Sequence, residues 1–482
     1  MMETWRRRLG LRFREGVTWS RDAGGAAQLT SPSFSPISLG ALPQALLAAF
    51  ERLDAEGPTL ETLTEGLDVQ DGPLAVATLL HHLRRLEQLA LLAYVVRDGE
   101  TTLSALHPIS PWFSLGSGDI DPARRYVLSR FAYQRRDGEG LVLESPRCHA
   151  LLRIEDAHAA ALCFTLARPT TPATLAVSGA SPDAMATFVS LLVAAGFVIP
   201  AEDSGRTEEE QAFQLASWSF HDLLFHARSR PGRHSWPCGK TYPFRDRVPP
   251  PPALRPPRTS APPPLPLPRP DLDALRKADR PFTAVLEGRR TVRAQGRDPL
   301  SVEQLGEFLY RSARVRALMP ATPASGYDVT SRPSPSGGAC HDLEIYLAID
   351  RCRGLDAGLY HYDPAAHALS RIQGRTPEVT ALLTGAALAT LRAELPQVLI
   401  CLASRFQRVS WSYEGISYSV TLKNVGALYQ TFYLVATTMG LACSGVGRGD
   451  SDLFCKAAGT EYYAETSVGE FVLGSRPEEG EE

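Results

Sequence analysis

The chain lacks the cysteine patterns that build zinc sites and disulfide frameworks. It has 8 cysteines, but none forms a C-x-x-C pair, and no Cys/His cluster has the spacing of zinc ligands. Several lie in apolar runs, such as Cys163 in AALCFTLA and Cys401 in VLICLAS, which is typical of buried free thiols. Because free thiols persist in reducing compartments, we expect a cytoplasmic protein. We expect no metal site, since His221, His226 and His234 do not share one helix face.

Long apolar runs and an excess of positive charge are also missing. No apolar run approaches the roughly 20 residues needed to span a bilayer. The basic N-terminal segment MMETWRRRLGLRFREG lacks the apolar core of a signal peptide. The formal net charge of −3 gives no overall field that would attract nucleic acid or acidic lipid. We therefore expect neither a membrane nor a nucleic acid as a partner.

The chain does have length and a proline-rich segment. Its 482 residues, 44% of them hydrophobic and 21% charged, are typical of a globular protein with two or three domains. Pro249–Pro270 reads PPPPALRPPRTSAPPPLPLPRP, and proline fixes φ and removes backbone donors. This segment predicts an extended linker or a strap along a surface. A ligand for a proline-binding module is the alternative.

The N-terminal half shows one order of elements twice. Three helices are predicted, at Leu42–Leu53, at Thr59–Leu67 and in a run from Leu74. Strands on either side of the Asp98-Gly99 turn then predict a two-stranded wing. The same order recurs from Ala157. We therefore predict two tandem winged-helix-like modules, followed by an amphipathic helix in residues 216–230.

Winged helices suggest two kinds of partner. DNA binding needs a basic third helix, but the first copy has only Arg84 and Arg85 there and the second copy has no Lys or Arg. The same fold can offer a strand edge to an extended peptide, which adds through main-chain hydrogen bonds. The charge pattern favours the peptide.

An arginine-rich segment follows a predicted helix at Phe282–Glu287. It contains Arg289, Arg290, Thr291 and Arg293. Three guanidinium groups and a hydroxyl within five residues can clamp a phosphate dianion with charge-assisted hydrogen bonds. A solvated basic patch is the alternative interpretation.

A second segment, residues 331–339, reads SRPSPSGGA and precedes a predicted strand at Leu343–Ile349. Its prolines predict a stiff turn. Its glycine pair, Gly337 and Gly338, lets the backbone approach a flat ligand closely. A plain loop leading into the strand is the alternative.

The remaining elements surround a long helix. A strand at Val398–Cys401 precedes it, and Val420–Met439 is apolar almost all round, which predicts a buried or dimer-interface helix. Gly440–Gly447 then predicts a glycine-rich turn able to touch a ring or a phosphate. The chain closes with a strand at Val468–Leu473 that leads to Arg476.

The order of RRTVR, SRPSPSGGACHDLEIYL, the long helix, GLACSGVG and SVGEFVLGS resembles SagB-type azoline dehydrogenases, most closely the oxidases of cyanobactin-like pathways. WSFHDLLFHARSRPGRHSWP is similar to the segment that precedes the domain in this family. The resemblance spans roughly Phe282 to Arg476. It implies an α+β protein whose C-terminal part is a nitroreductase-like, FMN-binding α/β sandwich, homodimeric, with FMN at the interface.

The resemblance also implies roles for single residues. Arg289, Arg290, Thr291, Arg293 and, near the C-terminus, Arg476 match phosphate contacts. Pro335, Ser336, Gly337 and Gly338 match the loop beside the isoalloxazine ring, with Arg332 of the same segment as a further cofactor-binding candidate, and Gly445 and Gly447 match a later flavin-contacting turn. The implied partners are an azoline-containing precursor peptide and a cyclodehydratase of the same pathway.

The implied reaction makes an azoline aromatic by removing a hydride, which FMN accepts, and a proton, which needs a base. Many relatives carry a Lys-Tyr pair at the position where this chain has Ser412 and Tyr413. A serine hydroxyl is a poor base, so Tyr413 is the leading candidate for proton transfer. Lys423 is the alternative if burial lowers its pKa, and His341 and Glu414 remain open.

These observations predict four parts: winged-helix-like modules at 1–115 and 116–205, a connecting helix and proline-rich linker at 206–270, and the oxidoreductase domain at 271–482. Two other functions remain open. One is an NAD(P)H-dependent flavin reductase or nitroreductase acting on small molecules, which would not need two extra modules. The other is a non-catalytic flavoprotein scaffold in a peptide-modifying complex, which the absent lysine keeps open. A transcription regulator with a flavin sensor domain is more distant.

Overall fold

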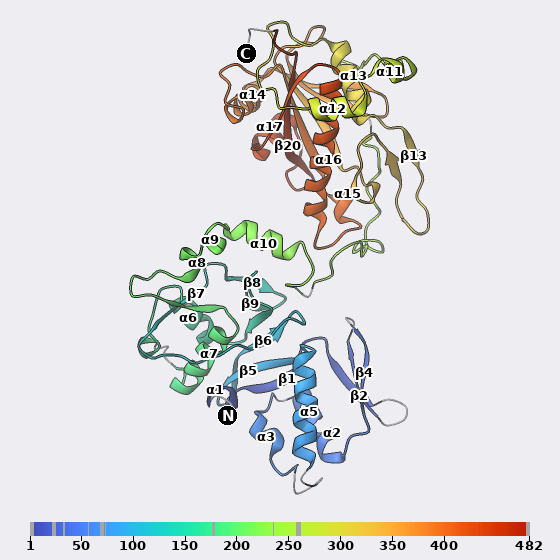
Figure 1. Ribbon diagram of the computed structural model, residues 1–482. Helices are drawn as coiled ribbons and strands as arrows, with labels where there is room; N and C mark the ends of the chain where they lie inside the picture. The colour runs from blue at the N-terminus through green and yellow to red at the C-terminus, as the bar shows by residue number, and fades with distance from the viewer. Residues whose placement is uncertain are drawn as a thin grey trace. The chain divides into compact units, whose positions relative to one another are not determined.

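The computed structural model describes residues 4–478 except 22–25, 32–33, 56, 68–71, 73, 176–178, 235 and 257–261. The chain forms two compact units, Met1–Trp236 and Pro237–Glu482 (Figure 1). The finer division into four parts stays a prediction. No helix in the described ranges is long and apolar enough to cross a membrane.

The first unit combines short helices with a six-stranded antiparallel sheet in the order β1-β5-β6-β10-β9-β8. Its helices are α1 (Thr4–Arg7), α2 (Gln44–Ala55), α3 (Leu60–Thr64), α5 (Leu74–Gln88), α6 (Ala157–Thr165), α7 (Pro182–Ala194), α8 (Glu208–Gln211), α9 (Phe213–Ala216) and α10 (Phe220–Arg228), with a 3-10 turn, η1, at Pro172–Thr174. Its strands are β1 (Gly10–Phe13), β2 (Thr18–Arg21), β3 (Ala27–Ser31), β4 (Phe34–Gly40), β5 (Leu92–Asp98), β6 (Thr101–Pro108), β7 (Arg125–Leu128), β8 (Tyr133–Asp137), β9 (Gly140–Glu144), β10 (Ala150–Ile154) and β11 (Val198–Ala201).

The two predicted repeats differ in detail. The first has its three helices, α2, α3 and α5, and the β5–β6 hairpin. In the second, the middle helix is only the turn η1, and β11 pairs with β7, which precedes the helices. Part of the segment after η1, residues 176–178, lies outside the described residues. The winged-helix interpretation stays a hypothesis.

The predicted amphipathic helix over residues 216–230 is wrong as a single helix. α9 ends at Ala216, and the helix within the segment is α10, where Ser219 forms the cap by accepting a hydrogen bond from the Asp222 amide at 3.1 Å. A serine that competes for backbone donors favours a helix start over a helix interior, which explains the break.

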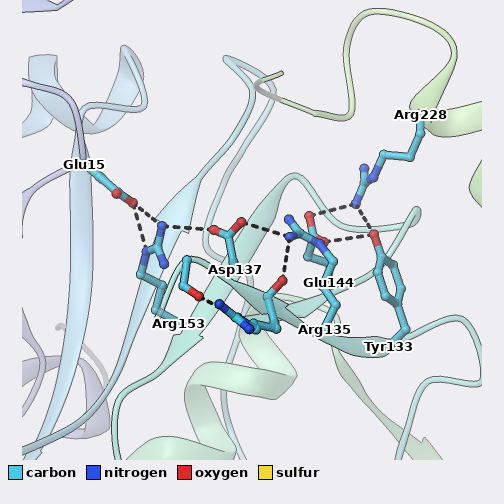
Figure 2. Close-up of polar contacts among 9 residues, drawn as sticks. Glu15, Tyr133, Arg135, Asp137, Glu144, Arg153 and Arg228 are labelled. Carbon is cyan, nitrogen blue, oxygen red and sulfur yellow. Dashed lines mark hydrogen bonds and ion pairs between the residues drawn. The ribbon is translucent and has the colours of Figure 1, made fainter. Parts of the chain in front are cut away.

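Alternating charges join α10 to the sheet of the first unit. Figure 2 shows this network of Glu15, Tyr133, Arg135, Asp137, Glu144, Arg153 and Arg228. Glu144, which is 2% exposed, accepts hydrogen bonds from Arg135 at 2.6 Å and Tyr133 at 3.0 Å, and it pairs with Arg228 of α10 at 3.4 Å. A buried carboxylate needs such partners, so this contact orients α10 more strictly than a surface ion pair would.

The second unit is built on a seven-stranded antiparallel sheet in the order β12-β17-β16-β15-β18-β20-β19. Its strands are β12 (Leu265–Pro266), β13 (Ala317–Met319), β14 (Val329–Ser331), β15 (Leu343–Ile349), β16 (Gly358–Asp363), β17 (Ala368–Gly374), β18 (Val398–Arg405), β19 (Ala442–Val446) and β20 (Glu465–Gly474). Its helices are α11 (Leu272–Ala278), α12 (Phe282–Gly288), α13 (Val302–Ala313), α14 (Pro377–Ala389), α15 (Gln407–Ser410), α16 (Ser417–Thr438) and α17 (Ser451–Ala458), with a 3-10 turn, η2, at Gly337–Ala339.

Helices cover both faces of this sheet, and Figure 1 shows β20 between α16 and α17. Side chains of a strand alternate between faces. On β15, Ile345 and Leu347 pack in the core under α13 and α16, while Tyr346 and Ala348 pack in the core under α14 and α17. Because both faces are buried, the strand is a continuous apolar run, as LEIYLAI indicated. The result is the predicted α/β sandwich.

One sequence expectation for this unit is wrong. Gly440–Gly447 was expected to be a glycine-rich turn, but residues 442–446 form β19, which pairs with β20 along its whole length. The turn is confined to Gly440, whose φ is +67°. Cross-strand pairing outweighs the weak strand preference of the sequence ACSGV.

The proline-rich segment is a strap in its described part. Two side chains donate to its carbonyl oxygens: Arg408 Nη1 to Pro251 (2.6 Å) and Arg405 Nη2 to Pro252 (3.0 Å). Trp411 Nε1 donates to the carbonyl of Val248, directly before the segment, at 2.7 Å. Proline lacks a donor but keeps its carbonyl acceptor, so this polarity suits the sequence. Beyond the gap at 257–261, the segment joins the sheet edge as β12. The prediction of a strap along a surface is therefore confirmed for the described residues of this segment.

We predict that Trp411→Phe loosens the strap while leaving the ring packing in place. The lost hydrogen bond is worth about 1 kcal/mol, so cleavage within 244–256 in limited proteolysis should be about fivefold faster. Trp112→Phe is the matched control, because Trp112 is 77% exposed in the first unit. Equal cleavage rates for Trp411→Phe and the unchanged chain would contradict this account of the strap.

Candidate active site

A buried carboxylate organises the centre of the second unit. Asp342, which is fully buried, accepts hydrogen bonds from three side chains: Ser404 Oγ at 2.7 Å, Thr421 Oγ1 at 3.0 Å and Asn424 Nδ2 at 2.7 Å. A carboxylate out of water is tolerated only when its oxygens are satisfied in this way. Because the donors lie on β18 and α16, Asp342 ties both elements to the start of β15.

Asn424 extends this network to the glycine loop. Its Oδ1 accepts a hydrogen bond from the Gly337 amide at 2.9 Å. A Cβ at Gly337 would lie 2.5 Å from Val420 Cγ1 of α16. Gly338 has a φ of +59°, and a Cβ there would lie 2.8 Å from the Tyr413 hydroxyl. The loop therefore needs glycine at both positions, one for its close approach to α16 and one for its backbone conformation.

Two tyrosine hydroxyls meet the loop at Gly338. Tyr327 donates to the Gly338 carbonyl at 3.0 Å, and Tyr413 lies against the same residue. Burial raises the pKa of Tyr413, and the Cys340 thiol raises it further, whereas the Lys240 cation lowers it. The Lys240 Nζ lies 5.9 Å from the centre of the Tyr413 ring. Tyr413 is thus a proton-transfer candidate beside the predicted ring-binding loop.

The arginine-rich segment gathers around Tyr433 of α16. Thr291 Oγ1 lies 3.2 Å from the Tyr433 hydroxyl, which accepts a hydrogen bond from the Gly445 amide at 2.8 Å. The Arg289 guanidinium lies over the same ring, 5.4 Å from its centre. The structure therefore brings together three residues that the sequence assigned to phosphate and flavin contacts.

The other phosphate candidates lie next to this group. The Gly296 amide donates to the Ser475 carbonyl at 3.1 Å, which places Arg476 beside the segment that follows Arg293. Arg293 also lines a cavity of about 520 Å³ together with Arg351 and Arg392. Within the described residues, the guanidinium groups of Arg289, Arg290, Arg293 and Arg476 form no ion pair with a carboxylate. Their charge is thus available to an anionic ligand.

The candidate residues form two groups along α16. Asn424 holds the glycine loop and Tyr433 holds the arginine segment, and the nine helical steps from one to the other correspond to about 14 Å. Near the loop, Arg332, Pro335 and Ser336 line a cavity of only about 20 Å³, whereas ligand pockets typically exceed about 300 Å³. Gly447 is exposed, with nothing within 4 Å of its Cβ position. The cavity that these three residues line is therefore too small for a flat ring.

The other candidates for the base are Lys423, His341 and Glu414, and their surroundings differ. Lys423 is exposed on α16, so the single chain does not bury it. Burial and the nearby Arg332 and Arg408 lower the pKa of His341 to about 3, which makes it a weak proton acceptor at neutral pH. The Glu414 carboxylate accepts a hydrogen bond from Thr241 at 2.8 Å. Tyr413 remains the candidate best placed at the loop.

Comparison with known families divides the chain in the same way as the structure does. The family model of the cyanobactin oxidase ThcOx matches residues 126–235, and the nitroreductase family model matches residues 286–474. The C-terminal unit thus carries an oxidoreductase domain of the nitroreductase family. Members of this family typically bind a flavin. Together the two matches confirm the resemblance drawn from the sequence, to SagB-type azoline dehydrogenases.

Curated relatives cover parts of the chain. A putative nitroreductase of Methanocaldococcus jannaschii is 29% identical over 37% of this chain and 81% of its own length. The trifolitoxin-processing protein TfxB of Rhizobium leguminosarum is 31% identical over 22% of this chain and 30% of its own length. The microcin B17-processing protein McbC of Escherichia coli is 30% identical over 23% of this chain and 42% of its own length. The chain thus spans less than half of each peptide-processing relative.

Solved structures resemble the chain more weakly. A putative nitroreductase from Ralstonia eutropha is 20% identical, with a TM-score of 0.34 over 47% of this chain and 94% of that one. The Escherichia coli microcin synthetase McbBCD complex, solved with truncated pro-MccB17 bound, gives 18% identity and a TM-score of 0.33 over 53% of this chain and 91% of the matched one. Because both TM-scores are below 0.5, the fold assignment depends on the family model and the sheet order instead.

We predict that Asp342→Ala destabilises the second unit. The substitution leaves the donors on Ser404, Thr421 and Asn424 without an acceptor in the core, which costs about 3 kcal/mol or more. Urea denaturation followed by circular dichroism measures the loss. Asp356→Ala is the matched control, because the Asp356 side chain is 82% exposed, and it should change the free energy of unfolding by less than about 0.5 kcal/mol. Equal effects of the two substitutions would refute the role of Asp342.

Proposed function

We propose that the chain is an FMN-dependent dehydrogenase that oxidises thiazoline or oxazoline rings to thiazoles or oxazoles in a ribosomally made peptide. One observation carries the proposal: a cyanobactin-oxidase region and a nitroreductase-family domain occur in one chain, and that domain places Tyr413 at its glycine loop. The names of two relatives, which process trifolitoxin and microcin B17, agree with a peptide substrate. An azoline substrate further implies a cyclodehydratase as a partner. The cytoplasm is the proposed location of the protein.

FMN fits the residues that are present. Its phosphate is a dianion, and Arg289, Arg290, Arg293 and Arg476 offer guanidinium groups without carboxylate partners among the described residues, with the Thr291 hydroxyl beside them. The isoalloxazine ring is flat, and the loop of Gly337 and Gly338 offers backbone without side chains. FMN, when bound, supplies the acceptor for the hydride that leaves the azoline ring.

A homodimer would complete the site. The two groups of candidate residues are about 14 Å apart along α16, and the loop alone encloses too little space for a ring. Phe282, Leu286, Leu318 and Met319 are exposed apolar side chains of the second unit, and Leu422 is exposed on α16 itself. Exposed apolar surface favours association. In the proposed dimer, each flavin takes its phosphate contacts from one chain and its ring contacts from the other.

The residues of the chain divide the remaining work. The arginine group would hold the phosphate end, and the glycine loop would offer its backbone to the ring. Tyr413 accepts the proton that the azoline carbon loses, while the hydride leaves from the neighbouring carbon. The first unit binds the leader or the core of the peptide, for which its strand edges offer main-chain hydrogen bonds. Reduction of nitro compounds or free flavin with NAD(P)H is the competing function.

Incubation with an azoline-containing peptide tests the reaction. We expect mass spectrometry to detect the loss of two hydrogens per ring without added NAD(P)H. Tyr413→Phe should lower kcat by about a hundredfold or more, because a positioned base contributes that much. Tyr463→Phe, at a residue that is 77% exposed, should leave kcat unchanged. NAD(P)H-dependent reduction of a nitro compound, with the azoline untouched, would favour the competing function.

Mixed dimers test the shared site. Arg289→Glu reverses charge in the phosphate group, and Gly338→Val strains the loop, so each homodimer should lose flavin. In a mixed dimer of the two variants, one site combines both defects and the other has neither. We therefore expect about one flavin per mixed dimer, measured by flavin absorbance per protein. A flavin-free mixed dimer would place each site within one chain.

A further inference from the structure

A short ladder joins the start of the second unit to the residues around Tyr413. The Gly239 amide donates to the Glu414 carbonyl at 3.0 Å, the Glu414 amide donates back at 2.9 Å, and the Tyr242 amide donates to the Ser412 carbonyl at 3.1 Å. The chain passes closely at Gly415, where a Cβ would lie 3.0 Å from the Pro237 carbonyl. These contacts fix the backbone of residues 237–242 against the segment between α15 and α16 that carries the proton-transfer candidate.

The ladder places the amine of Lys240 among three tyrosine rings. Its Nζ lies 5.2 Å from the ring centre of Tyr327, 5.4 Å from that of Tyr242 and 5.9 Å from that of Tyr413. All three distances are within the reach of a cation–π contact. Burial lowers the pKa of Lys240, but hydrogen bonds with the hydroxyls of Tyr327 and Tyr242 raise it above the usual value overall. Lys240 is therefore a cation at neutral pH.

Position 412 itself has no room for a charge. Ser412 is fully buried, and its Oγ donates to the Val409 carbonyl at 3.4 Å. Val409, which accepts this hydrogen bond, and Trp411, which precedes Ser412, belong to a hydrophobic cluster that also contains Cys340. A lysine side chain at 412 would lose its hydration without gaining a carboxylate partner, which is costly. The cation that contacts the Tyr413 ring comes instead from another segment.

We propose that Lys240 is the cationic partner of Tyr413. Lys240 lies in the segment before the catalytic fold, and from there it supplies the charge that a Lys-Tyr pair would place at position 412. Lys240 is a positioning residue: it acts through Tyr413 and takes no proton itself. Its consequence for catalysis rests on the proposed function, whereas its effect on the ionisation of Tyr413 does not.

The chemistry balances with Lys240 as a constant cation. The phenolate oxygen of Tyr413 forms an O–H bond as the azoline C–H bond breaks, and the electron pair of that bond enters the ring. The neighbouring carbon loses a hydride, for which a bound flavin would supply the acceptor, so the ring becomes the azole and Tyr413 becomes neutral. A fixed cation beside the ring stabilises the phenolate, which lowers the pKa of Tyr413 and increases the fraction able to accept a proton.

Other ionisable groups face this cluster and remain unchanged in the test. They are Tyr242 and Arg245 on the segment of Lys240, Tyr327 on the loop before β14, Cys340 at the end of η2, Arg408 on α15, and Glu414 next to Tyr413. Arg245 stacks on Tyr242 at 4.0 Å and Arg408 on Tyr327 at 5.5 Å, so each is closest to another ring. Lys240 is the cation in ring contact with Tyr413 among the described residues.

A difference titration tests the assignment directly. Tyrosinate absorbance is recorded against pH for the purified full chain and for Tyr413→Phe, and their difference is the titration of Tyr413. The same pair is then measured in a Lys240→Met background, where the flavin and the other tyrosines again cancel. We expect the midpoint of Tyr413 to rise by about one pH unit in Lys240→Met and to stay in place in Lys240→Arg. Lys456→Met, on α17, is the control for loss of a surface lysine.

The rate of azoline oxidation gives the second readout. One pH unit corresponds to about a tenfold loss of kcat/KM at neutral pH in Lys240→Met, with recovery as the pH rises and with Lys240→Arg close to the original rate. A Tyr413 midpoint that does not move, or a Lys240→Met variant with the original rate at neutral pH, overturns the role of Lys240. If the midpoint moves but the unchanged chain oxidises no azoline, the proposed function fails and the Lys240–Tyr413 pair stands.

Discussion

The carboxylate of Asp342 is the interaction on which the second unit depends. It stands at the start of β15 and is satisfied by side chains of β18 and α16, so it connects the central strands to the central helix. Through Asn424 it also holds the backbone of Gly337. This anchor holds the loop so close to α16 that a Cβ at Gly337 would lie 2.5 Å from Val420 Cγ1. A buried charge, which would be a cost elsewhere, here specifies one arrangement of the parts.

The framework of the second unit was predictable because its signals are local. LEIYLAI and VLICLA are strands with both faces buried, and the long apolar helix appears as α16 within a few residues of its expected ends. β19 was missed for the opposite reason. Its sequence, ACSGV, prefers no strand by itself, and it is extended because β20 offers a full ladder of partners. Pairing between distant segments decided that element, and one sequence read by itself does not reveal such pairing.

The candidate site was likewise predictable only where its signals are local in the sequence. The glycine, proline and arginine motifs identified the loop and the candidate phosphate segment in the sequence, because the residues that define each motif are consecutive. The grouping of these motifs on α16 could not be read from the sequence, and neither could Asp342, which looks like an ordinary acid between a histidine and a strand. Lys240 was missed as well. It lies far from residue 413 in the chain, and the backbone ladder that brings it close uses main-chain atoms, which leave no trace in residue types.

The strap extends the second unit beyond the residues that the nitroreductase family model matches. The nitroreductase match begins at residue 286, whereas the contacts of Trp411, Arg408 and Arg405 run to residues 248–252, and β12 closes the edge of the sheet. The second compact unit begins at Pro237, well before the family match. Recombination between related chains that cut at residue 286 would transfer a sheet without β12, and Tyr413 without Lys240. Shuffled or engineered hybrids of such enzymes should inherit the strap and the catalytic fold as one piece.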